Sequence, residues 1–275
     1  MRFETVTPEV QIGGLHGWHD VVPPTVRHDG GDWDDRITRH AAAMETHALT
    51  RRLFVEFHHR MRSLDETHLS GMGLRLEIGC GVFPMKHSYG DVLATDVVPA
   101  PSNDRLLDAE DMDLPDQSVR CIYGQFVFHH LAHPSAFLRE VERVCVPGGG
   151  AVLLEPASGP LAGLLYKNII KGETFDRNMI GWEASITDQT NGANQALGWI
   201  VFERDRERLK SEHPSLEVVV SKPSPSFMRY IASGGLNFPQ LVPTAAGPLL
   251  AAVERALTPV LPIAAIHQFY LIRRG

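Results

Sequence analysis

Apolar residues recur along the chain in two different patterns, and the pattern changes near residue 70. From residue 36 to about residue 69 they recur at helical spacing, as on one face of a helix. These residues are Ile37, Ala41, Met44, Ala48, Leu53, Phe57, Met61 and Leu64. The pattern predicts one or two helices, which follow an amino-terminal arm, residues 1–35, rich in Gly, Pro, His and Asp.

After residue 70 the apolar residues form short continuous runs instead. Such runs, bounded by polar or turn-forming residues, are typical of strands that are buried in a parallel sheet. Residues 134–146 carry a helical pattern that begins at Pro134 and ends at Pro147-Gly148. The apolar runs and this helix together predict an α/β fold. Its expected strands include residues 74–77, 92–95, 121–128, 151–154, 216–221 and 269–273.

The first of these strands ends in an acid and a glycine turn. Glu77 closes the apolar run and Gly79 and Gly81 follow it, so the backbone can turn tightly and a ligand can approach it. The next strand delivers Asp96 to its carboxyl end. In an open α/β sheet ligands bind beyond these ends, and an acid about 20 residues after a glycine turn is placed to bind a ribose diol. The arrangement predicts an adenosine-type ligand.

The spacing of the glycines separates two kinds of adenosine ligand. A dinucleotide site needs a third glycine so that the helix can pack on the strand, and here Val82, Phe83 and Pro84 follow Gly81 instead. A nucleotide-dependent oxidoreductase is therefore disfavoured. The stretch LEIGCG, residues 76–81, instead resembles the first motif of class I S-adenosylmethionine-dependent methyltransferases.

The resemblance continues from residue 106 to residue 156 in order and spacing. Asp108-Ala109-Glu110 resembles the acidic turn that meets the adenine in this family, and Leu114-Pro115-Asp116 resembles the lead into its fourth strand. Residues 146–150, VPGGG, resemble the turn before its fifth strand. Over about 80 residues the chain is thus similar to class I methyltransferases of the type 11 group.

The resemblance implies a Rossmann-like, doubly wound α/β fold around a seven-stranded, mostly parallel sheet, with helical insertions after strands five and six. Residues 1–70 are expected to form the arm and helices that pack on the core, and residues 71–275 the methyltransferase domain. The intervals around strand six are long, so residues 157–215 and 222–268 are expected as insertions on the acceptor side, where α/β enzymes build substrate pockets.

The cofactor that the resemblance implies is S-adenosylmethionine, whose product is S-adenosylhomocysteine. Glu77 and the glycine turn correspond to the methionine end, Asp96 to the ribose and residues 108–110 to the adenine, while Gln125 orients the cofactor or the acceptor. The full set of expected cofactor-binding residues is Glu77, Gly79, Cys80, Gly81, Asp96, Val97, Asp108, Ala109, Glu110 and Gln125.

Methyl transfer from a sulfonium is an in-line displacement, and an acceptor hydroxyl must also lose its proton. His129 and His130 follow strand four, where this family lines its active site, and imidazole titrates near neutral pH. One of them is the expected base, and Glu155, at the end of strand five, is the next candidate. The alternatives are that the histidines pack the loop on the cofactor side and that Glu155 binds neighbouring backbone amides.

Charge and composition narrow the choice of partners. The chain has 26 Lys and Arg against 33 Asp and Glu, a net charge of −7, which disfavours DNA or RNA as substrate.

The 3 cysteines of the chain form no disulfide framework, which fits a reducing cytoplasm, and its start lacks the pattern of a signal peptide. Its 14 histidines are spread along the chain, and adjacent ones such as His58 and His59 point to different sides of a helix, so no metal site is expected.

The expected reaction is methylation of a hydroxyl or carboxyl oxygen on a small metabolite or on a glycan or glycolipid precursor. Residues 166–176, 191–209 and 227–243 resemble bacterial methyltransferases that are often encoded beside polysaccharide and glycolipid assembly enzymes. The alternatives are C- or N-methylation of a natural product or lipid-like acceptor, and a non-catalytic binding protein with the same fold.

The segment 241–266 is strongly apolar, but prolines interrupt it, so it is not expected to span a membrane. Helices of this kind usually close a core or an interface between two copies of a chain. The other reading is that the segment touches a membrane surface or covers a lipid-like acceptor.

Overall fold

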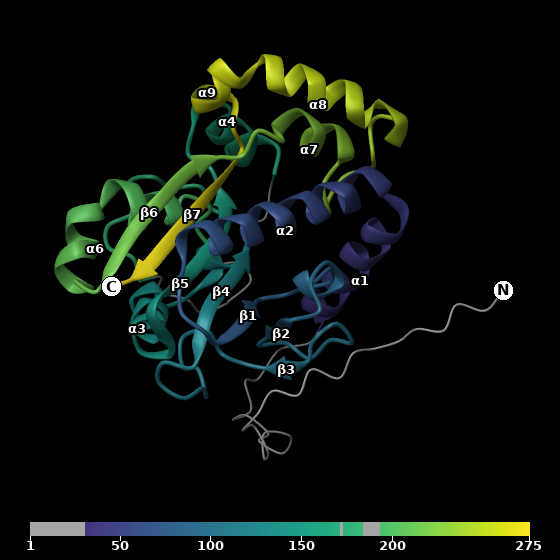
Figure 1. The fold of residues 1–275 in the computed structure, drawn as a ribbon. Helices are drawn as coiled ribbons and strands as arrows, with labels where there is room; N and C mark the ends of the chain where they lie inside the picture. Colours follow the sequence, from purple (N-terminus) through teal and green to yellow (C-terminus); the bar gives the residue numbers. More distant parts are fainter. Residues whose placement is uncertain (1–30, 171–172, 184–192) are drawn as a thin grey trace.

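The computed structural model describes residues 31–170, 173–183 and 193–275 (Figure 1). Its centre is a seven-stranded sheet with the order β3-β2-β1-β4-β5-β7-β6. All neighbouring strands pair in parallel except β7, which is antiparallel to β5 and β6. The prediction of a seven-stranded, mostly parallel α/β sheet is confirmed. The strands are β1 (Leu74–Ile78), β2 (Val92–Asp96), β3 (Arg105–Leu106), β4 (Val119–Gln125), β5 (Cys145–Pro156), β6 (Leu216–Pro223) and β7 (His267–Arg274).

Helices lie before the sheet, between its strands and around β6. The predicted helices between residues 36 and 69 are present as α1 and α2, but α1 also includes residues 31–35, which the sequence assigned to the arm. Residues 1–30 of that arm lie outside the described residues. The helices are α1 (Gly31–Thr46), α2 (Ala48–His68), α3 (Pro134–Val144), α4 (Pro160–Asn168), α5 (Leu197–Trp199), α6 (Arg206–Glu212), α7 (Phe227–Ser233), α8 (Gly247–Ala256) and α9 (Leu261–Ala264). Shorter helical turns are η1 (Met85–His87), η2 (Phe128–His130), η3 (Ile200–Arg204), η4 (Thr244–Ala246) and η5 (Thr258–Val260).

The hydrophobic core lies on both faces of the sheet, because successive residues of a strand point to opposite sides. Ile122 of β4 belongs to a buried cluster with Phe137 of α3, whereas its neighbour Tyr123 belongs to a second buried cluster with Phe57 of α2. The helices α2 and α3 therefore cover opposite faces, and Figure 1 shows α2 running across the sheet. This is the expected doubly wound arrangement.

The register of the central strands brings several carboxyl ends to one edge of the sheet. Leu76 of β1 lies beside Leu93 of β2 on one side and beside Ile122 of β4 on the other. Ile122 in turn lies beside Ala151 of β5. Because these four strands run in the same direction, the residues that follow them meet at a single edge, which we call the carboxyl edge.

The glycine-rich stretch before the fifth strand differs from its prediction. Residues 146–150 were expected as a turn, but β5 already starts at Cys145. Cys145 pairs with Val119 of β4, and the next paired residue of β5 is Gly150, which lies beside Cys121. The chain therefore bulges out between Cys145 and Gly150, and Gly148 has the positive φ of 79° that such a bend requires.

The segments on either side of β6 supply helices near the carboxyl edge. In Figure 1, α4, α7, α8 and α9 lie at the end of the molecule to which the arrowheads of β4 and β6 point. The helix α6, by contrast, packs beside β6, and its Leu209 joins the core cluster that also contains Ile122. Residues 157–215 thus contribute both to the carboxyl edge and to one face of the sheet.

The apolar segment 241–266 contains α8 and α9 and keeps some of its large side chains exposed. Leu249 and Ile263 are 69% and 59% exposed, whereas Glu254 is buried and forms an ion pair with Arg229 of α7. Among the described residues, none of the helices is long and apolar enough to cross a membrane. Contact of this segment with a lipid surface, or with a second copy of the chain, stays a prediction.

Candidate active site

The glycine turn after β1 borders open space at one of its two glycines. Gly79 and Gly81 have φ values of 55° and 53°, which L side chains rarely adopt. A Cβ atom at Gly79 would overlap the side chain of Val127, so this glycine permits close contact with the residues after β4. A Cβ atom at Gly81 would meet no atom of the described residues within 4 Å. A ligand can therefore approach the backbone at Gly81.

Asp96, the last residue of β2, holds this turn in place. One carboxylate oxygen accepts a hydrogen bond from the Gly81 N–H at 3.1 Å, and the other accepts one from the Val98 N–H at 3.2 Å. The residue is only 8% exposed. Because each carboxylate oxygen can accept about two hydrogen bonds, Asp96 can still bind ligand hydroxyls while it orders the turn.

Glu77 adds a buried carboxyl group close to Asp96. Its Oε2 accepts a hydrogen bond from the Met85 N–H of η1 at 2.7 Å. Burial raises the pKa of Glu77 from 4.5 to about 8, and the charge of Asp96 acts in the same direction. A cationic ligand group beside Glu77 would stabilise its charged form.

The expected adenine residues follow β3 and have different partners. Asp108 Oδ1 accepts a hydrogen bond from the Glu110 N–H at 2.8 Å. The carboxylate of Glu110 instead accepts the N–H of His133, also at 2.8 Å, directly before α3. Leu107 joins this turn to β2 through a hydrogen bond from its N–H to the Asp96 carbonyl. The turn therefore lies next to Asp96, and the Glu110 carboxylate supports the start of α3.

Three of the expected cofactor residues have side chains that are buried or half-buried. Cys80 and Ala109 are buried, and Val97 is half-buried. Burial raises the pKa of the Cys80 thiol far above its usual range, so the group stays neutral and unreactive.

β4 ends in a buried polar atom and a strained residue. Gln125 Oε1 is buried and has no hydrogen-bond partner among the described residues. An unsatisfied buried acceptor costs about 1–3 kcal/mol, which a ligand that donates a hydrogen bond would recover. The next residue, Phe126, has a φ of 57°, which is unusual for an aromatic residue and typical of functional sites.

Glu155, near the end of β5, anchors the segment that follows β4. Its carboxylate is fully buried and accepts backbone N–H groups of Val127, Phe128 and His129 at 3.0, 2.9 and 3.3 Å. It also binds His129 Nδ1 at 2.6 Å. The backbone-amide alternative is therefore the role that the geometry favours, and Glu155 acts as a positioning residue for His129.

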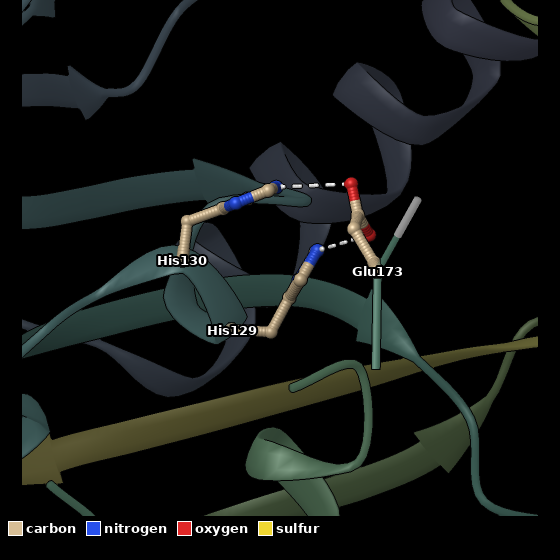
Figure 2. Close-up of side chains that lie close together, drawn as sticks. All are labelled: His129, His130 and Glu173. Carbon is tan, nitrogen blue, oxygen red and sulfur yellow. Dashed lines mark ion pairs between the residues drawn. The ribbon is translucent and has the colours of Figure 1, made fainter. Parts of the chain in front are cut away.

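The two candidate histidines converge on an acid from the insertion after β5. Figure 2 shows His129 and His130 with their imidazoles turned toward the carboxylate of Glu173. The Nε2 atoms of His129 and His130 lie 3.5 and 3.6 Å from the two different carboxylate oxygens. Glu173 also accepts hydrogen bonds from Gln195 at 2.8 Å and from Arg36 of α1 at 3.4 Å. We call His129, His130 and Glu173 the His-His-Glu cluster.

Electrostatics determine the protonation state of His129, and exposure distinguishes His130 from it. Burial alone would lower the pKa of His129, but the charges of Glu155 and Glu173 and hydrogen bonds to them raise it to about 10. Burial alone would raise the pKa of Glu173, but its hydrogen bonds with His129 and Gln195 and the charges of both histidines hold this pKa well below its usual range. His129 is therefore protonated near neutral pH in this ligand-free form and cannot act as a base. His130, whose side chain is 25% exposed, is the better placed of the two.

Sequence reasoning did not identify Glu173 or Gln195. Both lie in the insertion after β5, and neither stands beside a strand end, a glycine turn or another acid that would mark it. The expectation that no metal site is present stays a prediction, but the scatter of the histidines along the chain does not extend to every pair. His58 and His59 do have different surroundings, but His129 and His130 lie on one tight turn with ring centroids 4.3 Å apart.

Comparison with known protein families supports the predicted resemblance to methyltransferases. Residues 76–153 match the profile of the family described as "Methyltransferase domain". No protein among the curated sequences matches the chain.

Solved structures with related folds include geranyl diphosphate C-methyltransferase from Streptomyces coelicolor A3(2), with 12% identity and a TM-score of 0.43 over 78% of this chain and 77% of that chain. A second is an S-adenosylmethionine-dependent methyltransferase from Mesorhizobium loti, with 14% identity and a TM-score of 0.42 over 78% of this chain and 96% of that chain.

The matched segment contains the glycine turn, Asp96, the adenine turn and the two histidines. The match over residues 76–153 and the order of the strands support the resemblance to class I methyltransferases, a family whose cofactor is S-adenosylmethionine.

Proposed function

We propose that the chain transfers a methyl group from S-adenosylmethionine to an oxygen atom of a small-molecule acceptor. The observation that carries the proposal is the pairing of Asp96 with the Gly81 backbone beside open space, at the same edge of the sheet as the His-His-Glu cluster. The first feature suits the cofactor and the second suits the acceptor.

The residues at the carboxyl edge fit the chemical groups of the cofactor. Asp96 would hold the ribose hydroxyls, and the open backbone at Gly81 would lie against the methionine portion. Glu77 would pair with its ammonium group, and Gln125 Oε1 would accept a hydrogen bond that it otherwise lacks. The bound cofactor supplies an electrophilic methyl group, and the protein must align the acceptor oxygen with it.

The acceptor side would be built by the segment after β4 and the insertions. His130 and Glu173 are the polar groups there that an acceptor can reach, because Glu155 is fully buried and His129 is almost so. A hydroxyl acceptor has to lose its proton as the new bond forms. We assign His130 as the group that takes this proton, with Glu173 stabilising the imidazolium that results.

The chemical class of the acceptor follows from the same groups. A cluster of imidazole and carboxylate suits a hydroxyl or carboxyl oxygen, whereas C-methylation would favour an apolar surface around the reacting carbon. Metabolites and glycan or glycolipid precursors offer such oxygens. The net charge of −7 agrees with a small acceptor rather than a nucleic acid.

The test is a methyl-transfer assay with labelled S-adenosylmethionine and a panel of sugars, sugar nucleotides, lipid-linked glycans and hydroxy acids. His130→Ala should lower turnover by about 10²–10⁴-fold, as loss of a proton acceptor usually does. His133→Ala is the matched control, because His133 is an exposed histidine whose ring pairs with Glu183, outside the His-His-Glu cluster.

Two results would overturn the assignment. Turnover of His130→Ala within about threefold of the wild type would remove His130 from the reaction. If wild-type protein binds S-adenosylhomocysteine but methylates no acceptor of the panel, the alternative of a binding protein with a methyltransferase fold gains support.

A further inference from the structure

The His-His-Glu cluster has the donor atoms and spacing of a metal site. One ring nitrogen of each histidine and one carboxylate oxygen of Glu173 all lie within 4.8 Å of one another, and it is the Nε2 atom of each ring that lies nearest to Glu173. Each histidine is already 3.5–3.6 Å from Glu173 (Figure 2). Ligand atoms bound at about 2.0–2.2 Å to one ion lie up to ~4.2 Å apart, so small side-chain shifts would complete the geometry.

The tautomer of His129 is fixed in the way that metal-binding histidines usually require. Its Nδ1 lies 2.6 Å from Oε2 of Glu155, an acid that is fully buried and held by three backbone N–H groups. His129 must lose its Nε2 proton when a metal ion binds; Nδ1–H then still donates to this carboxylate, and the lone pair is left on Nε2, which faces Glu173. A carboxylate behind a metal-binding imidazole orients the ring and raises its basicity.

The carboxylate of Glu173 is also oriented by a neighbouring side chain. Gln195 donates a hydrogen bond to its Oε2 at 2.8 Å, and Gln195 is itself 2% exposed. Gln195 Oε1 is buried with no hydrogen-bond partner among the described residues, so a polar donor is missing beside the cluster. A water or an acceptor hydroxyl bound to a metal ion would provide such a donor.

We propose that His129 Nε2, His130 Nε2 and Glu173 bind one divalent transition-metal ion. Two imidazoles and one carboxylate suit Zn²⁺, Fe²⁺, Co²⁺ or Mn²⁺ more than Mg²⁺ or Ca²⁺, which prefer oxygen ligands alone. Three protein ligands on one side leave further coordination positions open, as in catalytic rather than structural metal sites.

The role of the ion rests on the proposed function. An acceptor hydroxyl that binds at an open position becomes more acidic, because the ion stabilises the oxygen's negative charge. The proton then leaves to solvent or to Glu173, and the oxygen lone pair forms the new bond to the methyl carbon while the carbon–sulfur bond breaks. With the ion bound, His130 is a metal ligand, so its assigned role as the base applies only to the metal-free protein.

The positive charge of Arg36 opposes the binding of a metal cation to the cluster. Its guanidinium lies 3.4 Å from Glu173 Oε1, the oxygen that also faces His130. A cation in the cluster must displace or share this contact. Arg36→Gln should therefore raise the affinity for the metal, whereas loss of any ligand should lower it.

The direct test uses the full-length protein after treatment with a chelator. Co²⁺ is titrated with detection by visible absorption, and Zn²⁺ by calorimetry. The wild type should bind one equivalent, with a Co²⁺ spectrum typical of mixed nitrogen and oxygen ligands. Glu173→Gln and His130→Ala should each weaken binding by at least about 100-fold, and His133→Ala, which alters an exposed histidine–glutamate pair, should not.

Failure of wild-type protein to bind either ion would overturn the metal site, and this result does not depend on the folding of any variant. Binding that is unchanged in Glu173→Gln would overturn it as well. His129 would then remain a protonated bridge between Glu155 and Glu173. S-Adenosylhomocysteine is titrated into the same samples, and the methyl-transfer assay is run on them, so that loss of the metal site can be told apart from loss of cofactor binding or of the proposed methyl transfer.

Discussion

At the residue scale, the groups next to the strands could be predicted and those in the insertions could not. Gly79, Gly81 and Asp96 stand at strand ends, where the fold fixes their backbone, and the structure brings them into one hydrogen-bonded turn. Glu173 lies in a segment without strong local preferences, and only the folded chain brings it to His129 and His130. A role that depends on contacts far apart in sequence leaves no local pattern.

The buried carboxyl of Glu77 should make the stability of the ligand-free protein depend on pH. Its folded pKa, about 8, lies above the ordinary value of 4.5. Between these values the folded state binds more protons than the unfolded state, so this group's contribution to stability is full below about pH 4.5 and is lost as the pH rises through 8.

Glu77→Gln removes this titration while keeping an oxygen that can accept the Met85 N–H. The free energy of unfolding, measured with urea between about pH 5 and 8, should therefore fall more steeply with pH in the wild type, by up to about 1.4 kcal/mol per pH unit. The difference between the two proteins isolates Glu77 from the other titrating groups. Parallel curves would show that Glu77 is charged in the folded protein over this range.

At the element scale, the segment after β4 depends on β5 for its shape. Glu155 receives the N–H groups of three successive residues and the ring of His129, so one side chain of β5 fixes η2. The sequence allowed this role for Glu155 alongside a catalytic one, because an acid at a strand end is compatible with both. Only the packing of β5 against β4 shows that the carboxylate is buried.

Glu155→Gln should destabilise the protein by about 3 kcal/mol, because an amide cannot accept all these hydrogen bonds and its NH₂ group would face other donors. Urea unfolding measures the change. Glu183→Gln is the control, because Glu183 is an exposed acid that binds His133 and Ser135, and its loss should change stability by less than about 0.5 kcal/mol. Equal effects of the two substitutions would contradict the anchoring role.

Two boundaries of elements were predicted wrongly, at the start of β5 and at the start of α1. The VPGGG stretch has the composition of a turn, but the chain on both sides of it pairs with β4, so it is a bulge in β5. The extent of α1 into residues 31–35 was missed because that stretch is rich in Gly and Asp. In both places, residues with weak helical or strand preference adopt the structure of their neighbours.

At the scale of the whole molecule, the fold could be predicted because its strands are continuous apolar runs in a known order. The seven-stranded sheet has helices on both faces, and its register brings the expected cofactor-binding residues to one edge. The shape of the acceptor side could not be predicted, because α4, α7, α8 and α9 are short helices joined by prolines and glycines. The acceptor itself is therefore a question for experiment.

The central claim is that S-adenosylmethionine binds at the carboxyl edge through Asp96 and the turn at Gly81. Calorimetric titration of S-adenosylhomocysteine into the wild type, Asp96→Asn and Gly81→Ala tests it most directly. Asp113→Ala is the matched control, because Asp113 is an exposed acid paired with Arg105. Thermal unfolding confirms that each variant is folded.

We expect one equivalent of S-adenosylhomocysteine to bind to the wild type and to Asp113→Ala. Asp96→Asn should bind at least about tenfold more weakly, because loss of a charge-assisted hydrogen bond costs about 1.5–3 kcal/mol. Gly81→Ala should also bind more weakly, because the added methyl group projects into the open space at the turn. Unchanged affinity in both folded variants, or no binding to the wild type, would contradict the account.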